Sequence, residues 1–197
     1  MPRRPADPAL KRAPAGNRRR VKTVGADGRR TVEVLVEISR GSRTKYELDE
    51  ESGRLRLDRV LHSSVHYPTD YGFIPGTLAS DGDHLDVLLI VEEPAVPGSL
   101  QEARPVGVLD MSDEKGRDQK VLAVPTGDPR FTQIKNLDDV PRHWLREIHT
   151  FFDTYKSLES GKEAVVRGWR GSRAAWQAID AARRAFEARE RRKRPER

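Results

Sequence analysis

Residues 81–91, DGDHLDVLLIV, place the carboxylates of Asp81, Asp83 and Asp86 on a Gly-containing turn at the mouth of an apolar strand. Three carboxylates in six residues cannot be part of a hydrophobic core. A turn that brings hard oxygen ligands together instead suits divalent ions such as Mg²⁺. A helix-loop-helix calcium site is excluded, because Asp86 stands sixth where a Gly is required and a strand-like run follows. The stretch predicts a strand whose acidic turn is either a cation site or a solvated surface.

The charge of the chain is divided unevenly between its ends and its middle. Of the net charge of +6, residues 1–30 carry +8 and residues 183–197 carry +5, so residues 31–182 carry −7. We expect residues 1–30 to be a basic, disordered N-terminal extension, residues 31–186 to be one folded catalytic domain, and residues 187–197 to be a basic C-terminal tail. Such tails could bind nucleic acid through its phosphates, but they carry no stacking aromatic residues.

Composition excludes several other classes of protein. With no Cys, the chain can form neither a disulfide nor a thiolate metal site. No apolar run approaches the roughly 20 residues of a membrane span, and the N-terminus has Arg residues without an apolar segment behind them. We therefore expect a protein that is neither inserted in a membrane nor exported, and so a cytoplasmic one.

Hydrophobic periodicity predicts several short strands followed by two helices. The predicted strands cover residues 31–38, 45–48, 55–60, 87–91, 104–111, 120–124 and 162–169. Residues 62–80, rich in Pro, Gly, Tyr and Ser, are predicted to be an ordered loop. Asp139 is predicted to cap a helix that stops before Gly161, and Ser172 to cap a second helix. This order favours an α+β fold, in which helices pack against a β-barrel or a highly curved sheet of antiparallel strands.

Charged side chains follow the polar faces of these strands and the turns beside them. If the faces converge, one cavity would hold eight carboxylates and three cations: Glu37, Glu47, Asp81, Asp83, Asp86, Asp113, Glu114 and Asp118 beside Lys45, Arg59 and Lys120. The carboxylates would repel one another unless divalent cations neutralised them, and those cations would need an anionic substrate. Because neither a Cys nor a Ser-His-Asp order stands out as a nucleophile, a metal-activated water is the better candidate.

Some of these residues have simpler interpretations. Lys45 and Glu47, on one face of a strand, could form a surface ion pair of little energetic value. Tyr67 and Tyr71 could offer hydroxyl groups to a polar ligand or could be packing residues. Tyr155 lies on the apolar stripe of the first predicted helix, which is also typical of a core tyrosine.

Five segments of the chain together resemble the soluble family I inorganic pyrophosphatases of the compact bacterial type. They are KYELDEESG (45–53), LDRVLHSSVHYPTDYGFIPGTL (57–78), DGDHLDVL (81–88), RPVGVLDMSDEKGRDQKVLAVP (104–125) and FFDTYKSLESGK (151–162). The resemblance covers roughly residues 31–186. It implies a five-stranded OB-like antiparallel β-barrel with two C-terminal helices packed against it. It also implies hydrolysis of inorganic diphosphate to two orthophosphates, several Mg²⁺ ions in each active site, and a homohexamer.

The resemblance also implies a role for each matching residue. Asp81, Asp86 and Asp118 resemble the principal metal ligands, Asp86 bridging two ions, and Asp113 resembles a ligand of a further ion. Asp83 resembles the catalytic residue that accepts a proton from the bridging water. The groups that hold the phosphates are matched by Lys45, Arg59, Tyr71, Lys120, Tyr155 and Lys156, the outer acidic positions by Glu37, Glu47 and Glu114, and a nearby supporting tyrosine by Tyr67.

His84 departs from the family pattern, which usually has Pro or Glu at this position. A His here could alter metal preference or pH response, although a solvent-facing side chain is the simpler interpretation. A different class also fits an OB-like barrel: a nucleic-acid-binding protein that uses its basic tails. The acidic body of the chain argues against nucleic acid as a partner.

Overall fold

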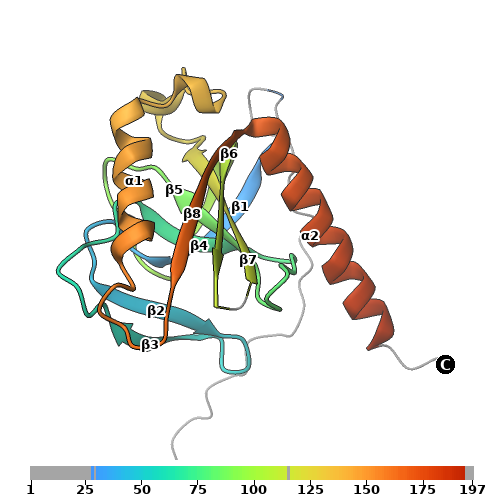
Figure 1. Cartoon of the computed structure of the whole chain (residues 1–197). Coiled ribbons are helices and arrows are strands. Elements are labelled where there is room, and N and C mark those ends of the chain that lie inside the picture. The colour runs from blue at the N-terminus through green and yellow to red at the C-terminus, as the bar shows by residue number, and fades with distance from the viewer. Residues whose placement is uncertain (1–27, 29, 115, 194–197) are drawn as a thin grey trace, which may run out of the picture.

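Eight strands and two α-helices form the part of the chain that the computed structural model describes, namely residues 28, 30–114 and 116–193 (Figure 1). The strands are β1 (Val32–Ile38), β2 (Thr44–Asp49), β3 (Arg54–Val60), β4 (Asp70–Ile74), β5 (Leu85–Leu89), β6 (Leu100–Asp113), β7 (Gly116–Pro125) and β8 (Ala164–Gly171). The helices are α1 (Arg142–Thr154) and α2 (Ser172–Arg192), preceded by the short 3₁₀ turns η1 (Pro129–Phe131) and η2 (Leu137–Asp139). The predicted N-terminal extension, apart from residues 28 and 30, and the last four residues of the predicted tail lie outside the described residues.

Six of the strands form one mixed sheet in the order β1-β4-β5-β7-β6-β8. Because β1 also pairs with β6, with Val32 opposite Ala103, five of these strands close into a ring. The prediction that all strands are antiparallel is wrong for β5 and β7, which run parallel with Val87 opposite Val121. Strand β6 crosses to pair with β1, and the β6–β7 hairpin then returns the chain beside β5 in the same direction.

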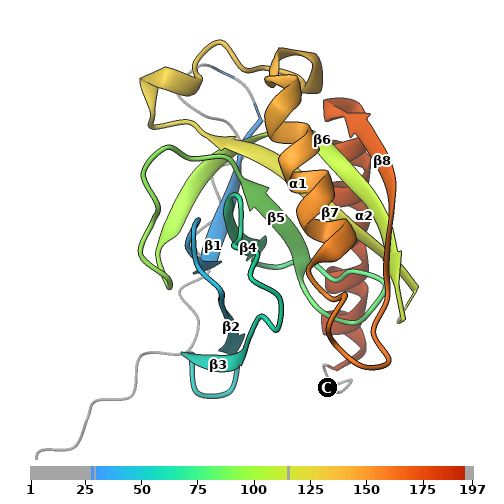
Figure 2. The same ribbon diagram turned by 60° about the vertical axis from the view of Figure 1, so that its left-hand side comes forward.

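The strands β2 and β3 form a separate two-stranded sheet. Figures 1 and 2 both show this hairpin below the six-stranded sheet, on the side where α1 ends. The site described below therefore has two walls, one from each sheet.

Strand β4 lies inside residues 62–80, where the sequence predicts only a loop. All five of its residues are buried, and it pairs with β1 and β5. The prediction is wrong because Gly is typical of loops but also occurs in strands, where, as at Gly72, it permits the close approach of two backbones. A Cβ atom at Gly72 would lie 1.9 Å from the carbonyl oxygen of Leu35.

Both faces of the central strands are buried. On β5, Val87 belongs to a hydrophobic cluster that includes Ile179 of α2, whereas Leu88 belongs to another that includes Ile148 of α1. Figure 1 accordingly shows α1 and α2 on opposite sides of the sheet. Burial on both faces explains why residues 87–91 read as an unbroken apolar run rather than as an alternating pattern.

The helix boundaries differ from the predicted ones at their starts. Asp139 does not cap α1, whose N-cap is Pro141. The carboxylate of Asp139 instead accepts hydrogen bonds from the backbone N–H groups of Lys135 and Asn136. Ser172 is the first residue of α2 rather than its cap, and α2 continues to Arg192, past residue 186. In the described part of the chain, neither helix is long and apolar enough to cross a membrane.

Candidate active site

A cavity of about 550 Å³ lies between the two sheets. It is lined by every residue that the sequence predicts for the site except Tyr67: Glu37, Lys45, Glu47, Arg59, Tyr71, Asp81, Asp83, Asp86, Asp113, Glu114, Asp118, Lys120, Tyr155 and Lys156. The faces that the sequence pattern marks as polar therefore do converge. Tyr67 packs behind the lining, with its ring 5.5 Å from that of Tyr71 in an edge-to-face arrangement.

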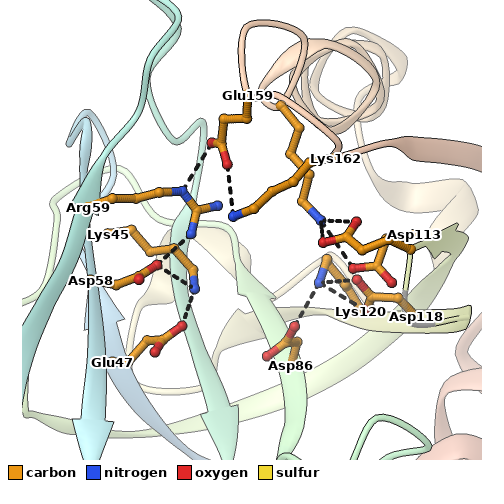
Figure 3. Close-up of polar contacts among 12 residues, drawn as sticks. Lys45, Glu47, Asp58, Arg59, Asp86, Asp113, Asp118, Lys120, Glu159 and Lys162 are labelled. Atoms are coloured by element: carbon orange, nitrogen blue, oxygen red, sulfur yellow. Dashed lines mark hydrogen bonds and ion pairs between the residues drawn. The ribbon is translucent and has the colours of Figure 1, made fainter.

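Lys120 on β7 lies at the centre of one wall (Figure 3). Its Nζ is 2.7 Å from Asp86 Oδ2, 2.9 Å from Asp118 Oδ2 and 3.0 Å from the Tyr71 hydroxyl, which itself donates to Asp86. The parallel pairing sets this arrangement, because the register of Val87 with Val121 puts Asp86 beside Lys120. Only 3% of the Lys120 side chain is exposed, so its charge depends on these carboxylates.

The ionisation of this group follows from its burial and its partners. Burial alone would lower the pKa of Lys120, but Asp86, followed by Tyr71 and Asp118, keeps that pKa well above its usual value. Burial raises the pKa of Asp118, an effect that Lys120 opposes. A cation is thus already held between two carboxylates that have lost much of their hydration.

A second lysine is paired in the same way. Lys156, which follows α1, has its Nζ 3.1 Å from Asp113 and 3.0 Å from Glu114, and 8% of its side chain is exposed. Tyr155 beside it is buried against Phe151, with which it stacks at 5.3 Å. The alternative of a core tyrosine therefore holds for the ring of Tyr155, although the residue also lines the cavity.

The opposite wall belongs to the β2–β3 hairpin. Lys45 contacts both Glu47 and Asp58, and Arg59 contacts Asp58 at 2.5 Å and Glu159 at 3.0 Å (Figure 3). The sequence pattern does not indicate Asp58 or Glu159 as site residues. In a regular strand, adjacent residues point to opposite faces. The pairing shifts between Lys45 and Tyr46, however, which leaves Asp58 as an unpaired extra residue on β3. This bulge turns Asp58 toward the same cavity as Arg59.

The acidic turn lies between these walls. Gly82 has a φ of +96°, and the N–H of Asp83 donates to the Asp81 carboxylate at 3.1 Å. The expectation that His84 faces solvent is wrong, because only 16% of its side chain is exposed. Its Nδ1 lies 2.7 Å from Thr77 O, and its Nε2 lies 2.8 Å from Glu50. In residues 28, 30–114 and 116–193, no three acidic or His side chains are grouped closely enough to hold a metal ion.

Glu37 on β1 is a cavity acid whose ionisation is strongly perturbed. Its side chain is buried, and it accepts a hydrogen bond from the N–H of Leu48 at 2.7 Å. Burial raises the pKa of Glu37 from 4.5 to about 7 despite this hydrogen bond. Below pH 4.5 the group is protonated in both the folded and the unfolded chain. As the pH rises to 7 the unfolded chain loses the proton first, so folding stability is lost over this window.

The change Glu37→Gln is expected to remove this pH dependence, because Gln keeps an acceptor for Leu48 N–H but cannot ionise. Relative to the variant, the wild type should lose up to about 3 kcal/mol of unfolding free energy between pH 4.5 and pH 8. Urea unfolding in EDTA at a series of pH values measures the difference. The exposed Glu51→Gln variant controls for the loss of one carboxylate, and parallel stability curves for Glu37→Gln and wild type would contradict the assignment.

Comparison with known proteins identifies relatives of this chain. Residues 34–187 match the family model for inorganic pyrophosphatase. The chain is 51% identical to the inorganic pyrophosphatase of Methanosarcina mazei over 150 residues, which span 76% of this chain and 88% of the relative. With that of Haloferax volcanii it shares 50% identity over 153 residues, or 78% of this chain and 86% of the relative.

Solved structures agree with this result. The crystal structure of inorganic pyrophosphatase from Thermus thermophilus superposes with a TM-score of 0.79 at 45% identity, covering 83% of this chain and 95% of that one. The Helicobacter pylori enzyme also gives a TM-score of 0.79, at 43% identity, covering 80% of this chain and 94% of that one.

A ring of strands beside a cavity rich in both cations and carboxylates, together with these similarities, defines a hydrolase. The chain belongs to the inorganic pyrophosphatase family. Its reaction is the hydrolysis of diphosphate.

Proposed function

We propose that this diphosphatase depends on Mg²⁺ and that Asp81, Asp86, Asp113 and Asp118 hold several ions in its cavity. The observation that carries the proposal is the ammonium group of Lys120, which lies between the carboxylates of Asp86 and Asp118. Two carboxylates that converge on one cation provide hard oxygen ligands of the kind that Mg²⁺ prefers. Asp81, on the adjacent turn, lines the same cavity. The donor set thus fits a hard divalent ion.

Bound Mg²⁺ would lower the pKa of water and offset charge on the substrate. Asp83 is proposed to accept the proton of the attacking water. Its position supports this role, because it lies on the turn between Asp81 and Asp86, lines the cavity and is exposed. A carboxylate that water can reach suits the role of a general base.

The cationic and tyrosine side chains are proposed to hold the two phosphates. They are Lys45, Arg59, Tyr71, Lys120, Tyr155 and Lys156, all of which line the cavity. The Lys and Arg groups contact carboxylates on both walls, so a polyanion entering the cavity would meet donors from both sheets. We propose that Glu37, Glu47 and Glu114 form the outer acidic shell and that Tyr67 supports Tyr71 through their ring contact.

Three wider features belong to the same proposal. The order β1-β4-β5-β7-β6 of the closed ring supports an OB-like barrel. The resemblance to compact bacterial members supports a homohexamer, and it supports a cytoplasmic location. Sedimentation equilibrium of the purified chain tests the hexamer: a mass near that of one 22.3 kDa chain would contradict it.

Orthophosphate release from diphosphate, measured with Mg²⁺ and after its removal by EDTA, tests the metal dependence. We expect release only with Mg²⁺. The change Asp118→Asn should raise the Mg²⁺ concentration needed for half-maximal activity by roughly 10-fold or more, because a neutral amide attracts the ion less than a carboxylate. The exposed Asp138→Asn variant is the control. Full release in EDTA, or an unchanged Mg²⁺ requirement in Asp118→Asn, would contradict the proposal.

A further inference from the structure

The acidic turn is in contact with the C-terminal part of α2. The family model ends at residue 187, whereas α2 continues to Arg192. Figure 1 shows this end of α2 extending past the sheet, beside the loop that joins β4 to β5. The N–H of Leu78 in that loop donates to the carbonyl oxygen of Ala182 at 2.9 Å, so the helix and the loop are tied through their backbones.

Four side chains lie in a row from the sheet to the end of the helix. His84 stacks on Phe73 of β4, with ring centroids 4.7 Å apart and an angle of 14° between the planes. On the helix side, the centroid of Phe186 is 6.0 Å from that of His84. The guanidinium carbon of Arg189 lies 5.5 Å from the centroid of Phe186. The imidazole of the turn is therefore held between an aromatic ring of the sheet and one of the helix.

Arg189 reaches beyond this row to the backbone of the turn. Its Nη1 donates to the carbonyl oxygen of Gly82 at 3.4 Å, and Arg189 lines the same cavity as Asp81 and Asp83. Its Nε is buried and, within the described residues, has no hydrogen-bond partner, whereas the contact of its Nη1 with Gly82 is exposed. The carbonyl that it contacts belongs to the residue with the positive φ, on which the shape of the turn depends.

We propose that Arg189 is a positioning residue that holds the turn 81–86 in the conformation that binds Mg²⁺. This inference rests on the proposed metal site. Without the contact from Nη1 to Gly82 O, the turn would keep its backbone hydrogen bond from Ala79 N–H to Asp83 O but would be held less firmly, and affinity for the ion would fall. The carboxylates themselves would remain, so the loss would be partial.

A simpler role for Arg189 is the stabilisation of the C-terminus of α2, where positive charge is favourable. Arg192 in the same last turn offers the same charge and is exposed, and no hydrogen bond or ion pair to the turn is found for it among the described residues. The variants Arg189→Ala and Arg192→Ala therefore lose the same charge from the same helix end. Only the first loses the contact with Gly82.

The test is calorimetric titration of the whole chain with Mg²⁺ in the absence of substrate, for wild type, Arg189→Ala, Arg189→Lys and Arg192→Ala. We expect Arg189→Ala to weaken Mg²⁺ binding by about 10-fold, the lower end of the range for removing a group that orients metal ligands. Arg192→Ala should bind as the wild type does. Arg189→Lys, which keeps the charge and one donor, should recover part of the affinity. In activity assays, saturating Mg²⁺ should restore most of the kcat of Arg189→Ala.

The outcomes separate this inference from the proposed function. Equal Mg²⁺ affinity in Arg189→Ala and wild type, with an active wild type, would overturn the positioning role alone. Equal losses in Arg189→Ala and Arg192→Ala would assign the effect to the helix end and would also overturn it. If the wild type neither binds Mg²⁺ nor needs it for hydrolysis, the proposed metal site itself fails. Unfolding temperatures in EDTA identify a variant that fails to fold, and Arg189→Lys then carries the comparison.

Discussion

Replacing Asp83 with Asn is expected to lower kcat for diphosphate hydrolysis by about 10²–10⁴-fold, the usual contribution of a positioned general base. Asn has nearly the shape of Asp but cannot accept a proton from water. The N–H of residue 83 would still donate to Asp81, and Gly82 would keep its positive φ, so the turn should retain its shape. Mg²⁺ affinity should therefore change little, which separates Asp83 from the proposed metal ligands.

Phosphate release under saturating Mg²⁺ and calorimetric Mg²⁺ titration measure the two quantities independently. The exposed Asp138→Asn variant lies outside the cavity and should match the wild type in both. If Asp83→Asn retains full kcat, another group accepts the proton. If it loses its Mg²⁺ affinity as well, Asp83 is a metal ligand rather than the base.

Replacing Lys120 with Met is expected to have the largest effect on stability. Met fills much of the same volume but leaves Asp86 and Asp118 without the cation between them. Removing one partner of a buried ion pair typically costs about 3–5 kcal/mol, and we expect a loss of about 3 kcal/mol because Asp86 remains 27% exposed. Urea unfolding in EDTA measures this loss.

Mg²⁺ should partly reverse the loss, because a divalent ion can neutralise the same two carboxylates. The unfolding temperature of Lys120→Met should therefore rise more with added Mg²⁺ than that of the wild type. Lys193→Met is the matched control, since the Lys193 side chain is 65% exposed and pairs with Glu190, itself 47% exposed, at 3.7 Å. An exposed pair of this kind contributes up to about 1 kcal/mol. Equal stability of Lys120→Met and wild type in EDTA would show that the central lysine does not balance the carboxylates.

The side chains on the polar faces could be predicted from the sequence because they follow local patterns, whereas their convergence on one cavity was only a condition, which the structure meets. Alternation placed Glu37 and Lys45 on polar faces, and the unusual density of carboxylates marked the turn at Asp81. The similarity of short segments to a known family then supplied roles for individual residues. These signals do not require knowledge of which strands are neighbours.

Features that depend on strand pairing could not be predicted in this way. A Gly is equally compatible with a loop and with a strand that approaches another backbone. The sequence around Gly72 therefore does not indicate β4. Asp58 faces the cavity only because β3 bulges opposite Lys45. The partial burial of His84 depends on Phe73 and Phe186, which are distant from it in sequence. The hydrophobic periodicity of a single segment cannot predict contacts between residues that are distant in sequence.

The parallel pairing of β5 with β7 also sets an order of events during synthesis. A nascent chain emerges from the ribosome N-terminus first. The edge of β5 that pairs with β7 therefore stays unpaired until the whole β6–β7 hairpin has left the ribosome. Before that moment, Asp118 and Lys120 are not beside Asp86, so the Lys120 ammonium group does not yet lie between the two carboxylates. Binding of an ion between Asp86 and Asp118 can therefore stabilise the nascent chain only after β7 has been synthesised, although α1, β8 and α2 still follow.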